Sequence, residues 1–267
     1  MTSPTLPRTP ALYHAGGGPP ASLGPAAALA ITAGAVGTFY VLAGLLPRDV
    51  ALVVGQLGQA TVAVTAAWLF ANAGPRGAAR TLGLVVPRGI HVVAAVLLGV
   101  SCWYIDLRIV DLIPVFDTDG SDAHALTDLV RAPSLAASLV TLALVPAICE
   151  ELVFRGILAR GLTPRLPPVA AAAVAAEVFS AYHLSPLQAI PAVLLGFALG
   201  ALALRARSLV PAMLAHALNN AFVIAVSRDD SPGGAASWLD GHPWSALAGA
   251  VVLAGTGLAI VVGARPA

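Results

Sequence analysis

Charged side chains are scarce in this chain, at 10% of its 267 residues, while 58% are hydrophobic. Soluble domains carry about 25% charged residues, so this composition excludes a water-soluble globular protein. Lysine is absent, and the fourteen basic residues are arginines scattered along the chain. Because a nucleic-acid site requires a clustered basic face, we expect no nucleic-acid partner.

Cysteine is also rare. The two cysteines, Cys102 and Cys149, lie on separate apolar segments. This excludes a disulfide framework and gives no sign of a cysteine metal site, so we interpret both as packing residues.

Long apolar runs are what the sequence has in abundance. A bilayer core of about 30 Å is spanned by about 20 apolar residues in a helix. Eight runs approach or exceed this length and are separated by Pro, Gly, Arg or Asp clusters. The sequence therefore predicts an all-α polytopic transmembrane bundle of about eight spans, at 25–46, 50–71, 89–112, 133–163, 167–185, 187–204, 208–226 and 244–263.

The chain divides into a tail and one membrane domain. Residues 1–24 are rich in Pro, Gly and small polar residues without an apolar period, which predicts a disordered N-terminal tail. Residues 25–265 are then a single membrane domain. The first apolar run is longer than the core of a secretory signal, so we interpret it as a span.

The arginines predict the orientation of the bundle. They fall in three loops that eight spans place on one side, namely Arg76, Arg80 and Arg88, then Arg160 and Arg165, then Arg205 and Arg207. Loops rich in Lys and Arg face the cytoplasm. We therefore expect both termini in the cytoplasm and an integral protein of a bacterial plasma membrane.

The three glutamates of the chain all lie inside predicted spans. A carboxylate near the centre of a membrane helix costs roughly 2.5–3.5 kcal/mol, so such residues usually face a polar cavity. Glu151 and Arg155 are four residues apart, which favours an ion pair on one helix face. Glu150 points about 100° away. Alternatively, both acids pair with arginines of neighbouring helices and only fix the packing. Glu177 receives no role.

Two further predicted spans carry histidines. His183 follows Phe179 at helical spacing, just before Ser185 and Pro186, and alone it fits a structural residue bonded to a backbone carbonyl. His216 and Asn220 share one helix face, whereas Asn219 points elsewhere. Alone, this pair fits interhelical hydrogen bonding. Together with the glutamates, the set offers a general base, a proton carrier and neutral donors for an oxyanion.

These residues form three motifs in order, Glu150-Glu151-Leu-Val-Phe-Arg155, Phe179-x-x-x-His183 and His216-x-x-x-Asn220. The combination resembles the CPBP intramembrane protease family, which includes type II CAAX prenyl endopeptidases and bacterial proteins of bacteriocin self-immunity. The resemblance covers about 133–226, the expected catalytic core. It implies a polar cavity inside the membrane, open to the cytoplasm, where a peptide bond of a membrane-associated protein or peptide is hydrolysed.

The resemblance also implies roles for residues at matching positions. Glu150 would be the general base, aided by His183, and His216 and Asn220 would donate to the oxyanion. Glu151, Arg155 and Phe179 would support them. Two histidines and a glutamate also match a zinc site, with Glu150, His183 and His216 as ligands. The H-E-x-x-H signature is absent, and we favour a metal-free site with zinc as the alternative.

Three questions stay open from the sequence. His183 lies toward the end of its span, so the motifs are level only if a helix tilts or the fifth span breaks early at Pro186. A non-catalytic scaffold or immunity protein would keep the same motifs. A proton-linked transporter is a weaker alternative, because its polar residues should occur in both halves of the chain.

Overall fold

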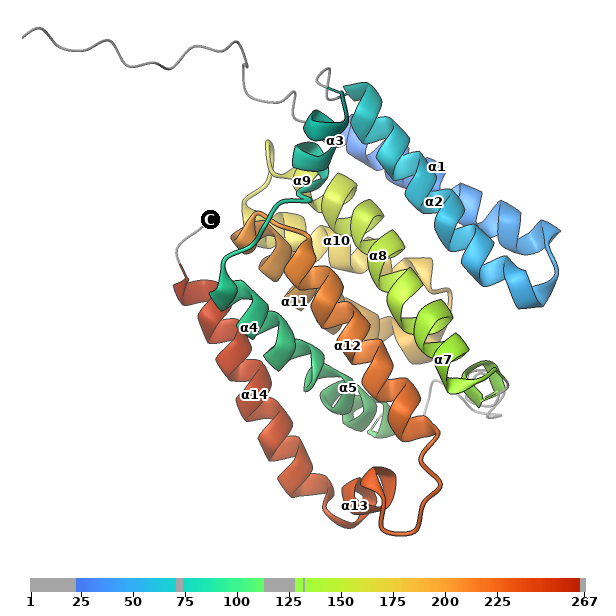
Figure 1. The fold of residues 1–267 in the computed structure, drawn as a ribbon. Coiled ribbons are helices and arrows are strands. Elements are labelled where there is room, and N and C mark those ends of the chain that lie inside the picture. The colour runs from blue at the N-terminus through green and yellow to red at the C-terminus, as the bar shows by residue number, and fades with distance from the viewer. Residues whose placement is uncertain (1–22, 71–73, 113–127, 132, 265–267) are drawn as a thin grey trace, which may run out of the picture.

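The computed structural model describes residues 23–70, 74–112, 128–131 and 133–264. The predicted tail, 1–24, lies outside this part of the chain except for its last two residues. Every regular element in the described part is a helix (Figure 1), which confirms the all-α prediction.

Seven helices are long and apolar enough to cross a membrane, among the residues that the structure describes. They are α1 (Pro25–Leu45), α2 (Arg48–Phe70, crossing with Val50–Phe70), α4 with α5 (Gly89–Gly99 and Cys102–Asp111), the composite fourth span (Leu135–Leu162), α11 (Pro186–Ala206), α12 (Val210–Ser227) and α14 (Pro243–Gly263). Two short helices connect them, α3 (Gly74–Leu82) and α13 (Ala235–Gly241).

The fifth predicted span, 167–185, is shorter than expected. Helix α10 (Pro168–Tyr182) has 15 residues, about 22 Å, which is less than a bilayer core of about 30 Å. It ends because Pro186 disfavours helical backbone in Ser185, whose φ and ψ are extended, and Pro186 then starts α11. The early break that the sequence left open is therefore present at this position.

The fourth span contains two π-helical segments within an otherwise α-helical course. It runs through α7 (Leu135–Ser138), α8 (Val145–Glu151) and α9 (Arg160–Leu162), and π-helical segments η1 (Leu139–Leu144) and η2 (Leu152–Ala159) flank α8. Such wider turns occur often at functional sites. Pro146, near the start of α8, has no N–H to donate to the carbonyl of Leu142, four residues earlier. That carbonyl therefore needs another donor.

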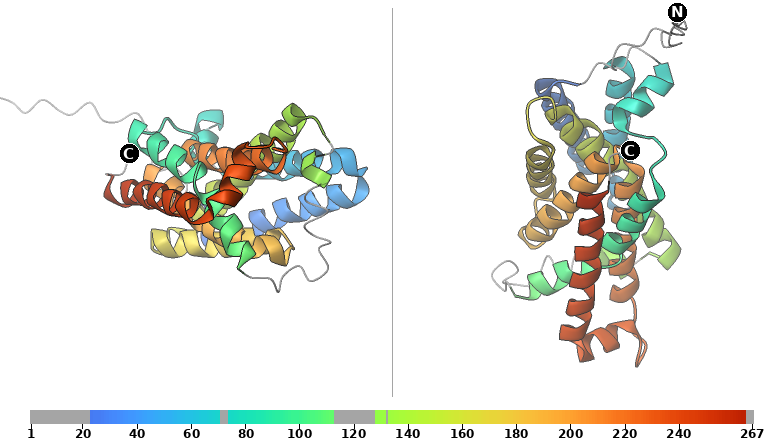
Figure 2. Two further views of the ribbon diagram at one scale, coloured as in Figure 1. Left: turned by 90° about the horizontal axis from the view of Figure 1, so that it is seen from below. Right: turned by 90° about the vertical axis from the view of Figure 1, so that its left-hand side faces the viewer.

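The fourth span lies at the centre of the packing. It contacts α1, α2, α10, α11 and α12, while α12 and α14 also pack on α4. Figures 1 and 2 show α1 and α2 as an antiparallel pair along one side of the bundle. Small residues allow these close approaches. A Cβ atom at Gly99 of α4 would lie 2.7 Å from the carbonyl oxygen of Ala215 in α12, so only glycine fits there.

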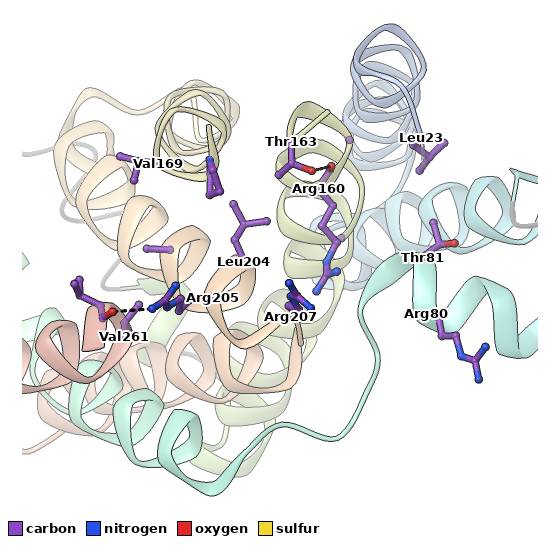
Figure 3. A pocket seen from close by; sticks show the side chains of 15 residues that line it. Leu23, Arg80, Thr81, Arg160, Thr163, Val169, Leu204, Arg205, Arg207 and Val261 are labelled. Atoms are coloured by element: carbon purple, nitrogen blue, oxygen red, sulfur yellow. Dashed lines mark hydrogen bonds between the residues drawn. The ribbon is translucent and has the colours of Figure 1, made fainter. Parts of the chain in front are cut away.

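Arginines from all three predicted arginine loops gather at one end of the bundle. Arg80, Arg160, Arg205 and Arg207 line one pocket there (Figure 3). The loops thus share a side, as the span count predicted. Which side of a membrane this end faces stays a prediction.

Candidate active site

The two adjacent glutamates of α8 are buried inside the bundle. Glu150 is 5% exposed and Glu151 is fully buried. Neither faces lipid, and each has its own hydrogen-bond partners. Their surroundings differ, because consecutive residues of a helix point about 100° apart.

Glu151 is held by a cation and an imidazole. Arg155 donates from Nη1 to Glu151 Oε1 at 2.7 Å, which is the ion pair expected from their spacing. His216 Nδ1 lies 3.0 Å from the same oxygen. Arg155 also donates from Nη2 to the carbonyl of Gly196 in α11 at 3.1 Å. Glu151 thus ties α8, η2 and α12 together and fixes the orientation of His216.

Glu150 faces the other nitrogen of the same histidine. Its Oε1 accepts a hydrogen bond from Gln56 Nε2 at 2.7 Å, and its Oε2 lies 3.8 Å from His216 Nε2. The second distance is too long for a direct hydrogen bond. A carboxylate at Nδ1 favours the tautomer protonated there, which leaves the lone pair of neutral His216 on Nε2, facing Glu150.

Two glutamines of α2 belong to this site, and the sequence reasoning missed them. Gln56 and Gln59 are 1% and 0% exposed. Gln59 donates to Gln56 Oε1, and each Nε2 lies 3.4 Å from Tyr182 Oη of α10. A signal existed, because these are the only two amide side chains of the predicted second span and lie three residues apart. Amides in membrane helices commonly hydrogen-bond across helices.

His183 lies at the end of α10 beside Phe179. Its Nδ1 is 2.9 Å from the Phe179 carbonyl oxygen, so Nδ1 carries the proton and a neutral ring keeps its lone pair on Nε2. The Phe179 ring centroid lies 4.8 Å from that of His183 and 6.0 Å from that of His216. The guanidinium carbon of Arg155 lies 4.4 Å from the same centroid. Phe179 thus connects the two histidines, but no hydrogen bond joins His183 to Glu150 within the described residues.

Asn220 is tied to the backbone of the fourth span. Its Nδ2 donates to the carbonyl of Leu142 at 3.1 Å, the carbonyl that Pro146 cannot satisfy. Asn219, the neighbouring residue, is buried and donates to Asn220 Oδ1 at 3.4 Å. One N–H of the Asn220 amide has no partner in these two bonds and can serve a ligand.

The arrangement of His, Cys, Asp and Glu side chains bears on the zinc alternative. Within the described residues, no group of three or more His, Cys, Asp or Glu side chains has the arrangement of a metal site. His216 uses Nδ1 for Glu151, and His183 lies apart from Glu150. Glu150, His183 and His216 therefore do not form such a group. The zinc alternative stays a prediction.

Comparison with known proteins gives one match. Residues 132–222 match the sequence model of the type II CAAX prenyl endopeptidase Rce1-like family. The comparisons with curated proteins and with solved structures returned no match. The matched segment contains the fourth span, α10, α11 and most of α12, and so every residue of the three motifs. With seven apolar helices of membrane-crossing length among the described residues, the chain is an integral membrane protein, and its residues 132–222 are similar to the Rce1-like type II CAAX prenyl endopeptidases.

Proposed function

We propose that this chain is an intramembrane endopeptidase in which Glu150 activates the hydrolytic water. The observation that carries the proposal is the position of Glu150, which is buried between Gln56 on one side and His216 on the other. A carboxylate in such a place is rare in a membrane protein and usually serves function. The family match to a protease agrees with this assignment.

The water would bind beside the gap between Glu150 Oε2 and His216 Nε2. At 3.8 Å, these two atoms are too far apart to bond to each other, and one water can contact both. Glu150 would take a proton from this water as the oxygen attacks the peptide carbonyl. The same proton would then pass to the leaving amine, as in general acid–base catalysis.

His216 and Asn220 would stabilise the oxyanion. When His216 carries a proton on Nε2, that nitrogen is a donor, while Nδ1 stays bonded to Glu151. Asn220 would add its second N–H. His183, with its lone pair on Nε2, would aid proton transfer from the far side of Phe179. Donors of this kind contribute about 2.7–4 kcal/mol each when they are pre-positioned.

The substrate would be a membrane-associated protein or peptide. A prenylated CAAX-type chain is the first candidate because the matched family is named for that activity. A scaffold or immunity protein of the same fold is the second candidate, since it would keep the family motifs without chemistry. The polar residues of the site come mainly from the second half of the chain, which disfavours a transporter.

The test is Glu150→Gln in the full chain, expressed in cells that lack the protein. Peptides released from the membranes are compared by mass spectrometry, and any cleaved bond is then assayed with the purified protein. We expect cleavage to be lost. Glu177→Gln is the matched control, because Glu177 is exposed on α10 and should leave cleavage unchanged. Equal cleavage by Glu150→Gln and wild type would remove this mechanism, and no cleavage by the wild type would favour the scaffold.

A further inference from the structure

A second polar region lies at the arginine end of the bundle, apart from the hydrolytic residues. It is a pocket of about 800 Å³ with four arginines in its lining and no Asp or Glu. Figure 3 shows the side chains of Arg160, from α9, and Arg207, from the turn after α11, approaching one another, whereas Arg205 of α11 points toward the end of α14 and Arg80 lies apart. The rest of the lining is largely apolar, with Leu204 and Val261 among its members.

Arg160 is the best defined of these cations. Its Nε and Nη2 atoms are buried and have no hydrogen-bond partner. The backbone makes room for the guanidinium, since a Cβ atom on Gly83 would lie 2.1 Å from Nη2. Gly83 has a φ of +81°, which glycine adopts without strain. Two of the three guanidinium nitrogens of Arg160 thus have no partner among the described residues, and an anion in the pocket would supply one.

The neighbouring arginines agree with an anionic ligand. Arg205 donates from Nη2 to the carbonyl of Val262 at 2.9 Å, while its buried Nε has no partner. Arg207 closes α11 with a φ of +52°, where glycine is usual and another residue costs about 1–2 kcal/mol. An arginine at this strained position adds positive charge to the pocket that a glycine would not supply.

We propose that this pocket binds the phosphate of an anionic phospholipid, with Arg160 as the principal contact. Guanidinium groups pair strongly with phosphate oxygens. The apolar walls, formed at the ends of membrane-length helices, fit the glycerol and the first acyl carbons of a lipid better than a free ion. Basic pockets between membrane helices are known sites for anionic head groups. This inference does not depend on the proposed peptidase activity.

The test measures lipid binding by the purified full chain. Native mass spectrometry follows the titration of dioleoyl phosphatidylglycerol, with dioleoyl phosphatidylcholine as the neutral lipid. We expect preference for the anionic lipid, and about tenfold weaker binding to Arg160→Gln, as for loss of a charge-assisted hydrogen bond. Arg165→Gln is the matched control, because Arg165 is exposed in the same loop and does not line the pocket. Its binding should equal that of the wild type.

Further variants and competing ligands show whether the pocket binds a lipid or another anion. Arg160→Lys keeps the charge and should restore part of the binding, and thermal unfolding shows whether each variant is folded. Equal binding by Arg160→Gln and Arg165→Gln would overturn the proposal, as would equal affinity for the two lipids. Displacement of the lipid by millimolar inorganic phosphate would indicate a free-anion site instead. Displacement by a peptide with a free C-terminal carboxylate, but not by its amide, would assign the pocket to substrate.

Discussion

Glu150 and Glu151 are adjacent in sequence, yet their partners separate their functions. Glu151 accepts from Arg155 and contacts His216, so its charge is neutralised by fixed neighbours. Among the described residues, Glu150 has the neutral donor Gln56 and a more distant imidazole. Pairs of carboxylates with different surroundings are a frequent basis for different roles in one site. This difference agrees with the proposal that Glu150, rather than Glu151, accepts the proton of the water.

Gln56 should therefore matter for turnover. Gln56→Ala removes the only short hydrogen bond to Glu150 found in the described residues, and bonds to charged groups contribute about 1.5–3 kcal/mol. We expect kcat to fall at least about tenfold in a peptidase assay. Thr61→Ala, which changes an exposed residue of the same helix, should have no effect. A wild-type kcat for Gln56→Ala would show that Glu150 is positioned without it.

Arg155 is fully buried, so the loss of its charge should lower the stability of the protein. Arg155→Met leaves Glu151 buried without its cation, which costs about 3–5 kcal/mol. The double variant with Glu151→Gln should recover much of this loss, because no unpaired charge remains. It would still lose the carboxylate that orients His216. Thermal unfolding in detergent measures both. Equal destabilisation of the single and double variants would contradict the prediction.

Among the elements, the fourth span and α10 show how far the sequence could predict the site. Hydropathy located the spans to within a few residues, because apolar length is what a bilayer requires. The ion pair of Glu151 and Arg155 could also be predicted, because residues four apart lie on the same face of a helix. The contact of Gln56 with Glu150 could not be predicted in this way, since it depends on which helix faces of separate segments meet. The missed glutamines lie outside the three motifs.

The winding of the fourth span gives a second stability prediction. If Asn220 replaces the donor that Pro146 lacks, then Pro146→Ala restores a backbone N–H and makes the side-chain bond to Leu142 partly redundant. Asn220→Ala should cost about 1 kcal/mol in the wild type and clearly less in the Pro146→Ala background. The measurement is the unfolding free energy of the wild type, the two single variants and the double variant, which together form a double-mutant cycle. Additive effects would show that the two residues act independently.

The connection after α12 should respond to acid. Arg131 donates to both carboxylate oxygens of Asp230, at 2.7 and 2.9 Å, and this holds the pKa of Asp230 below its ordinary 3.8. The contribution is therefore present above pH 3.8 and is lost as the pH falls through the lowered value. Hydrogen exchange of 228–234, corrected for intrinsic rates, should rise on acidification. Arg131→Gln should show the faster exchange already at neutral pH, whereas Arg108→Gln should behave as the wild type.

On the scale of the whole molecule, the clustering of arginines predicts its orientation. The arginine end should face the cytoplasm, because translocation of basic loops is disfavoured. In a variant without Cys102 and Cys149, a cysteine at Pro232 should react with a membrane-impermeant maleimide in intact cells. A cysteine at Pro164, at the arginine end, should react only after permeabilisation. The reverse pattern would invert the bundle and place the proposed lipid pocket in the outer leaflet.

The hydrogen bond from Gln56 to Glu150 joins the two halves of the chain. Gln56 lies on α2, far outside the matched segment 132–222. A chimera that receives only residues 132–222 of this chain would therefore keep the Glu150 carboxylate without its donor from α2. Such chimeras should gain the proposed turnover only when α2 is transferred as well, because the candidate site draws on both halves of the chain.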